Sequence, residues 1–228
     1  MNTSIPSRKF LAAGAMVLAS CVAVVALMHT KAARPLLSAI GIHCPVDEAS
    51  GSDVATAQAR GFAALRGSSP APARPGVASM PLGQFAESDA LRWAAMNHAH
   101  CEIVVKGLRF LRCRGVDGNL LGVAGPPISE LWLSFGLSGK LIGVDVYRRG
   151  LDAQGEMVAW ADATDRLKSN LGEPTAKVGD ASPKILSATA YSTARVQYRY
   201  ADYLATVTAI YLPYAGLAVR EQYISNGS

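Results

Sequence analysis

Histidine is scarce in this chain of 228 residues, and the motifs that usually organise catalysis are missing. The only histidines are His29, His43, His98 and His100, whereas a serine or cysteine triad needs a histidine base. Neither a GxSxG nucleophile elbow nor an SxxK pair occurs in the sequence. We therefore predict no catalytic residue, although an enzyme whose site is assembled from distant residues would leave no such motif.

Two stretches resemble binding motifs without completing them. Gly136–Lys140 ends like a phosphate loop, but Ser134 stands where the first glycine of that motif belongs. His98, His100 and Cys101 carry atoms that zinc accepts, yet no CxxC knuckle accompanies them. We predict neither a cofactor nor a metal site.

Charge is also sparse, since only 17% of the residues are Asp, Glu, Lys or Arg. The net charge of +5 arises mostly near the N-terminus, at Arg8, Lys9, Lys31 and Arg34. Removing those four from the 22 basic residues leaves 18, against 17 acidic residues, from Cys44 onward. A nucleic-acid-binding domain needs a basic surface, so we predict no nucleic-acid partner.

The longest uncharged apolar run is residues 10–28, FLAAGAMVLASCVAVVALM. A helix of 19 residues reaches about 28 Å, close to the thickness of the bilayer hydrocarbon, whereas a secretory signal has a shorter apolar region. We therefore predict a retained transmembrane helix in contact with membrane lipid, preceded by a cytoplasmic segment, residues 1–9. Cleavage of the segment is an open alternative.

A second alternative is a lipid anchor, because Leu18-Ala19-Ser20-Cys21 resembles the lipobox of bacterial lipoproteins. In that case Cys21 carries the lipid and becomes the new N-terminus. An apolar stretch follows Cys21 where lipoproteins have a polar tether. Either anchor places the remainder of the chain in the cell envelope, and we predict that it lies in the periplasm.

Cys101 and Cys113 bracket a short predicted hairpin that turns near Gly107. Folding about that glycine puts the two cysteines opposite each other, at a separation that suits a disulfide. We predict this bridge in an oxidising compartment; in a cytosolic protein the two would be buried free thiols. Cys44 is left over, and could be free, pair between chains or replace one partner.

Residues 29–82 are predicted to hold a helix within residues 47–66 and a tether, residues 68–81, which contains four prolines. The compact domain is expected at 83–228. Its clearest helix spans residues 153–171, capped by Asp152 and closed by Gly172. The predicted buried stripe of this helix is Met157, Trp160, Ala161, Thr164, Leu167 and Leu171.

Strands are predicted in pairs, at residues 103–105 with 109–111 and at residues 128–135 with 141–147. The chain then ends in a three-stranded meander at residues 195–200, 203–211 and 217–224. This order predicts an α+β fold in which helices pack on an antiparallel sheet.

Alternation along the meander sorts its residues into two faces. The apolar face includes several tyrosines and also Glu221, which needs a partner there. The polar face carries threonines, glutamines and the arginines Arg195, Arg199 and Arg220. We predict these arginines as a candidate interface, although an ordinary solvated sheet face is the simpler interpretation.

The hairpin LWLSFGLSGKLIGV, the helix that ends in Leu171-Gly172-Glu173-Pro174-Thr175 and the following meander resemble small proteobacterial envelope proteins. A similar order occurs in outer-membrane assembly lipoproteins of the SmpA/OmlA type and in β-lactamase-inhibitor-like domains. The resemblance covers less than half of the chain and carries over no functional residue. It implies a periplasmic interaction module.

The leading hypothesis is thus a non-catalytic envelope protein whose domain contacts another protein or the cell wall. The alternatives are an envelope enzyme without a visible motif and a carrier of a small apolar ligand, which would need an enclosed cavity.

Overall fold

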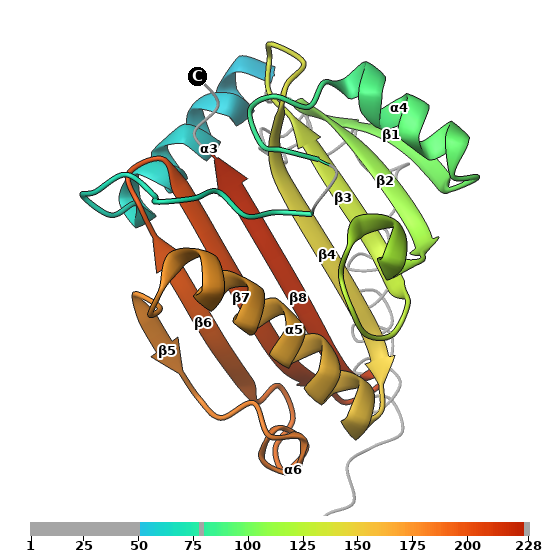
Figure 1. The fold of residues 1–228 in the computed structure, drawn as a ribbon, viewed down its shortest axis with the longest axis vertical. Coiled ribbons are helices and arrows are strands. Elements are labelled where there is room, and N and C mark those ends of the chain that lie inside the picture. The colour runs from blue at the N-terminus through green and yellow to red at the C-terminus, as the bar shows by residue number, and fades with distance from the viewer. Residues whose placement is uncertain (1–50, 78–79, 226–228) are drawn as a thin grey trace, which may run out of the picture. The chain divides into compact units, whose positions relative to one another are not determined.

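The computed structural model describes residues 51–77 and 80–225, which belong to one compact unit, Ala49–Ser228. Its fold is α+β, with helices on an eight-stranded, wholly antiparallel sheet of strand order β1-β2-β3-β4-β8-β7-β6-β5 (Figure 1). The predicted membrane helix at residues 10–28, Cys21 and Cys44 lie outside the described residues. Among the residues that are described, no helix is long and apolar enough to cross a membrane.

The same plan, a helix followed by four antiparallel strands, occurs twice along the chain. The first copy is α4 (Glu87–Met96), β1 (His100–Lys106), β2 (Leu108–Val116), β3 (Ile128–Phe135) and β4 (Leu141–Leu151), with a short 3₁₀ helix η2 (Gly118–Leu121) before β3. The second is α5 (Ala153–Leu171), β5 (Ala176–Val178), β6 (Thr193–Arg199), β7 (Tyr203–Leu212) and β8 (Gly216–Ser225), with α6 (Pro183–Leu186) after β5. Pairing of β4 with β8 joins the two copies into one sheet.

Both predicted hairpins and the final meander are confirmed, although every strand except β3 is longer than expected. The first hairpin turns at Gly107, whose φ of +72° favours glycine. The sequence pattern missed β5 and α6, which are only three and four residues long. Elements this short carry too few residues for a hydrophobic period to be recognised.

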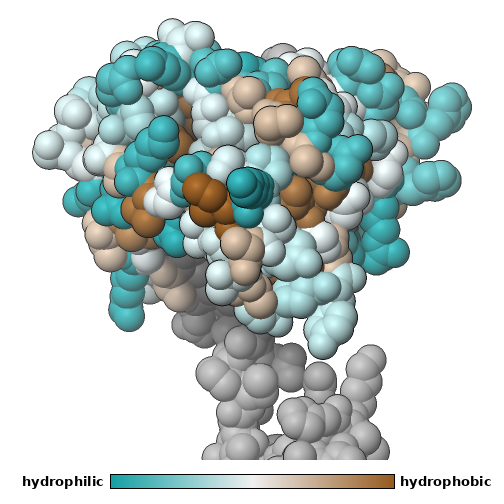
Figure 2. All heavy atoms as spheres, turned by 90° about the horizontal axis from the view of Figure 1, so that it is seen from below, coloured by the Kyte–Doolittle hydropathy of each residue, from teal (hydrophilic) through white to brown (hydrophobic). Residues whose placement is uncertain are grey.

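The main core lies on the side of the sheet that α5 covers, in front of β7 and β8 in Figure 1. Leu131, Leu133, Val144, Val207 and Val219 are among its fully or almost fully buried residues. Burial of such side chains is the main stabilising contribution to a domain of this size. At the lower end of the molecule, apolar surface residues form separate small groups between polar ones (Figure 2).

Helix α5 has the predicted ends, because capping is a local property. The side chain of Asp152 accepts a hydrogen bond from the Gly155 amide at 2.7 Å. At the other end, the Gly172 amide donates a hydrogen bond to the Lys168 carbonyl. The predicted buried stripe is partly wrong. Leu167 and Leu171 are buried, but Met157 is 45% exposed and Ala161 is exposed too.

The face of α5 that meets the sheet carries small residues and one acid instead. Gly155, Glu156, Ala159 and Ala163 are buried there together with the two leucines. Small side chains let the helix backbone approach the sheet closely, so the helix is rotated relative to the orientation that hydropathy alone predicts. Met157 and Trp160 are thereby turned to the side of the helix.

The proline-rich segment is not a free tether, and the predicted domain boundary at residue 83 is wrong. The domain already includes α3 (Gly51–Leu65) and the chain that follows it. Met80 is fully buried, the Tyr203 hydroxyl donates to the Pro75 carbonyl, and Asp202 accepts from the Ala71 amide at 2.8 Å. Residues far along the chain therefore bind this proline-containing segment to the domain.

Glu221 lies on the buried face of the meander, and it has the partner that this position requires. Arg148 and Arg166 both donate to its carboxylate, the latter at 2.6 Å, and the Tyr223 hydroxyl donates at 2.6 Å. Arg148 is itself fully buried and also donates to the carbonyls of Pro126 and Ala124. A buried carboxylate is tolerated when its oxygens are bonded in this way.

Candidate functional site

The polar face of the sheet, opposite the main core, is the candidate interaction surface. Strand register aligns its side chains into rows that run across both halves of the domain. One row contains Gln197, Thr206, Gln222, Asp145, Trp132 and Arg112, and the next contains Arg195, Thr208, Arg220, Tyr147 and Glu130. Most of these residues are half-buried, and Arg195 is exposed. These two rows, together with Arg199 farther along β6 on the same side, define the polar face below.

At the junction of β4 and β8, Asp145 organises the polar face. It accepts hydrogen bonds from Arg220 at 2.8 Å and from Gln222 at 3.1 Å. Burial raises the pKa of Asp145 above its usual value, and the Arg220 guanidinium opposes that rise. Arg220 in turn lies 5.0 Å from the centre of the Tyr147 ring, so that its cation rests on an aromatic surface.

A second group on the polar face surrounds Trp132. The indole nitrogen donates to Glu130 at 2.9 Å, and Arg112 donates to the same carboxylate at 2.8 Å. The Arg112 hydrogen bond holds the pKa of Glu130 below its usual value. Arg112 also lies 5.0 Å from the centre of the Trp132 ring. In both groups, therefore, an arginine packs against the aromatic ring and a carboxylate holds that arginine in position.

The structure brings the three predicted arginines onto one side of the sheet, but they are not equivalent. Arg195 and Arg220 share a row, separated by Thr208 on β7. Arg199 lies farther along β6 and donates to Gln197 at 2.7 Å. Because Arg220 is paired with Asp145, the surface is less basic than the three arginines alone suggest.

Sequence reasoning missed half of this surface. Trp132, Asp145 and Tyr147 come from the first set of strands, and they join the arginines only through the β4–β8 pairing. That pairing links residues about 75 positions apart. Alternation along β3 and β4 could have placed these side chains on one face, but no local signal predicts which strand lies beside β4.

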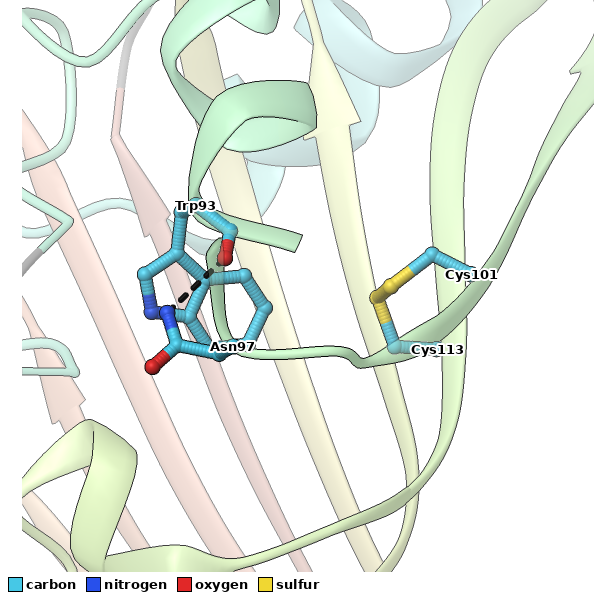
Figure 3. The surroundings of a disulfide bond; sticks show 4 residues. All are labelled: Trp93, Asn97, Cys101 and Cys113. Atoms are coloured by element: carbon cyan, nitrogen blue, oxygen red, sulfur yellow. Dashed lines mark hydrogen bonds between the residues drawn. A yellow bond between two sulfur atoms is a disulfide. The ribbon is translucent and has the colours of Figure 1, made fainter. Parts of the chain in front are cut away.

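The cysteine pair lies at the edge of the sheet, where the structure joins Cys101 of β1 to Cys113 of β2 in a disulfide. The two residues are directly opposite in the register, as predicted. Figure 3 shows the bridge near the end of α4, where the Asn97 side chain donates to the Trp93 carbonyl at 2.8 Å. The bridge fastens β1, an edge strand, to the rest of the sheet.

His98 and His100 flank the start of β1, on either side of Ala99. His98 has a φ of +52°, a backbone conformation that turns the chain between α4 and β1. Within residues 51–77 and 80–225, no three His, Cys, Asp or Glu side chains are grouped so that they could hold a metal ion.

The fold thus defines a class, an α+β domain with one eight-stranded antiparallel sheet and two different faces. Comparison with protein-family models, with curated proteins and with solved structures gave no match for this chain. The resemblance to SmpA/OmlA-type proteins stays a prediction.

Proposed function

We propose that this chain is a non-catalytic, membrane-tethered protein of the bacterial cell envelope. Residues 10–28 anchor it in the cell membrane, as a retained helix or through a lipid on Cys21, and the domain lies in the periplasm. Its partner is another protein or the cell-wall layer, bound through the polar face. The disulfide between Cys101 and Cys113 supports this compartment, because such bridges persist in oxidising environments.

The observation that carries the proposal is the composition of the polar face. Trp132 and Tyr147 are each in contact with an arginine, and each arginine is paired with a carboxylate. Tryptophan, tyrosine and arginine are the residues that most often dominate binding energy at protein interfaces. Holding them in place before binding lowers the entropic cost of ordering them in a complex.

The balance of charge favours a protein partner over a strongly anionic polymer. Asp145 and Glu130 offset Arg220 and Arg112. Among the residues that the structure describes, no carboxylate is bonded to Arg195 or Arg199 on this side of the sheet. A surface of paired charges around aromatic rings resembles the mixed composition of ordinary protein interfaces.

The test is crosslinking of the tagged full chain in living cells, followed by mass spectrometry of the captured partners. Arg199→Glu and Arg195→Glu each reverse a charge on this side of the sheet without breaking an ion pair to a carboxylate of the described residues. Arg92→Glu on α4 is the control, because the Arg92 side chain is 70% exposed, lies outside the polar face and takes part only in an exposed 3.7 Å ion pair with Asp89 among the described residues. We expect both face variants, but not the control, to lose capture of the same partner while circular dichroism is unchanged. Equal capture by all three variants would reject the polar face as the interface.

A further inference from the structure

A groove lies between α5 and the segment that contains β5 and α6, on the side of the sheet opposite the polar face. Figure 1 shows where these elements lie. Its larger part has a volume of about 590 Å³ and is lined by Glu156, Met157, Trp160, Lys177, Asp180 and Pro183, among others. A second hollow of about 210 Å³ adjoins it and shares Trp160 and Lys177. The larger part has the size that small-molecule sites commonly have.

The side chains of α5 are arranged around this groove in an unusual way. Met157 and Trp160 are the large apolar residues of the first half of the helix, and both line the groove. Glu156, the residue next to Met157, is instead fully buried. A helix packed only for stability would bury the apolar residues and expose the acid. Departures from such local rules are typical of binding sites.

Glu156 has no hydrogen-bond partner for either carboxylate oxygen among the described residues. The comparison with Glu221 is informative, because that glutamate is equally buried and is bonded by two arginines and a tyrosine. An unpartnered buried carboxylate is costly for the folded state. Burial accordingly raises the pKa of Glu156 to about 7.

The other charges of the larger hollow show which ligand would suit it. Its charged lining residues are Glu156, Lys177 on β5 and Asp180 before α6. A hydrogen bond from the Ser182 amide lowers the pKa of Asp180, which favours its ionised form. The charges of Lys177 and Asp180 cancel, so the buried carboxylate of Glu156 determines which ligand charge the groove prefers. A cation provides a partner for this carboxylate, and the aromatic ring of Trp160, which also lines the groove, can attract a cation beside it.

We propose that this groove binds a small organic ammonium compound, with the charged nitrogen against Glu156 and the carbon body against Trp160 and Met157. Because both carboxylate oxygens are covered in the free domain, the Glu156 side chain must turn toward the groove on binding, and the ammonium group then supplies its missing partner. No residue of the polar face takes part, so this site is independent of the proposed interaction surface.

Binding of 2-phenylethylammonium chloride to the purified full chain in a mild detergent tests the proposal. The neutral probe 2-phenylethanol has nearly the same shape and no positive charge. Isothermal titration calorimetry should show that the ammonium probe binds at least about tenfold more tightly, the factor expected for one charge-assisted pair. The ammonium probe should also change the tryptophan fluorescence, because Trp160 lines the site.

Two variants and one control locate the binding. Glu156→Gln should lower the affinity for the ammonium probe by about tenfold or more and leave the affinity for the alcohol unchanged. Trp160→Leu should lower the affinity for both probes, because both pack their carbon body against this ring. Glu102→Gln, the same chemical change at a half-exposed residue of β1, should leave both affinities unchanged. Equal affinity for the two probes, no binding of the ammonium probe by the wild-type chain, or an unaltered affinity in Glu156→Gln would each overturn the proposal.

Discussion

Replacing Glu156 with glutamine should make the domain more stable at high pH and should change its stability little at low pH. Glu156 is fully buried, and neither oxygen has a partner in the part of the chain that the structure describes. The substitution keeps the size of the side chain and removes only its ability to ionise. It therefore isolates the cost of a buried charge from the cost of an altered core.

The sign and size of this stability change follow from the pKa of Glu156, which burial raises from 4.5 to about 7. Between these values the folded chain keeps a proton that the unfolded chain has lost, so the stability falls as pH rises through this window. The penalty is absent below about pH 4.5 and complete above about pH 7. A pKa difference of one corresponds to about 1.4 kcal/mol, which gives a total cost of about 3 kcal/mol above pH 7.

The assay is thermal unfolding of the full chain in detergent, with wild type and Glu156→Gln compared at pH 4 and pH 8. Any pH-independent effect of the amide cancels when the two differences are subtracted. The variant should gain about 3 kcal/mol relative to wild type between the two pH values, or roughly 6–12 °C in melting temperature. Glu102→Gln, which alters a half-exposed carboxylate that pairs with Arg112 and Arg114, serves as the control. A difference that stays constant from pH 4 to pH 8 would refute a buried, unpartnered Glu156.

Two further predictions concern the core and the edge of the sheet. Arg148→Met should destabilise the domain by about 3–5 kcal/mol in urea unfolding, because it removes one of the two cations bonded to the buried Glu221; a loss below about 1 kcal/mol would mean that Arg148 contributes little to that cluster. Replacing Cys101 and Cys113 together with serine should cost about 3 kcal/mol, the loop-entropy value for a bridge of this span, and a reducing agent should produce the same loss in wild type but none in the variant.

The parts of the fold that depend on neighbouring residues could be predicted from the sequence. The ends of α5 follow from Asp152 and Gly172, and both hairpins follow from short apolar runs on either side of a glycine-containing turn. The position of Cys101 opposite Cys113 follows from the same turn chemistry. The need of Glu221 for a partner was also visible, since alternation put it among apolar residues.

The parts that depend on distant contacts could not be predicted. The segment after α3 contains prolines and therefore resembles a linker, yet Asp202 and Tyr203, far along the chain, bind it to the domain. The buried face of α5 follows from close packing of Ala159 and Ala163 on the sheet, which hydropathy does not detect. The polar face needs the β4–β8 pairing, and the groove needs the short β5 and α6.

The most direct test of an envelope-tethered interaction domain is its location. Two reporters fused after Ser228 of the full chain, one active only in the periplasm and one active only in the cytoplasm, would be compared in a Gram-negative host. We expect activity from the periplasmic reporter alone, with the product remaining in the membrane fraction after a high-salt wash. Activity from the cytoplasmic reporter alone would contradict the anchor orientation, the role of the disulfide and the proposed periplasmic partner together.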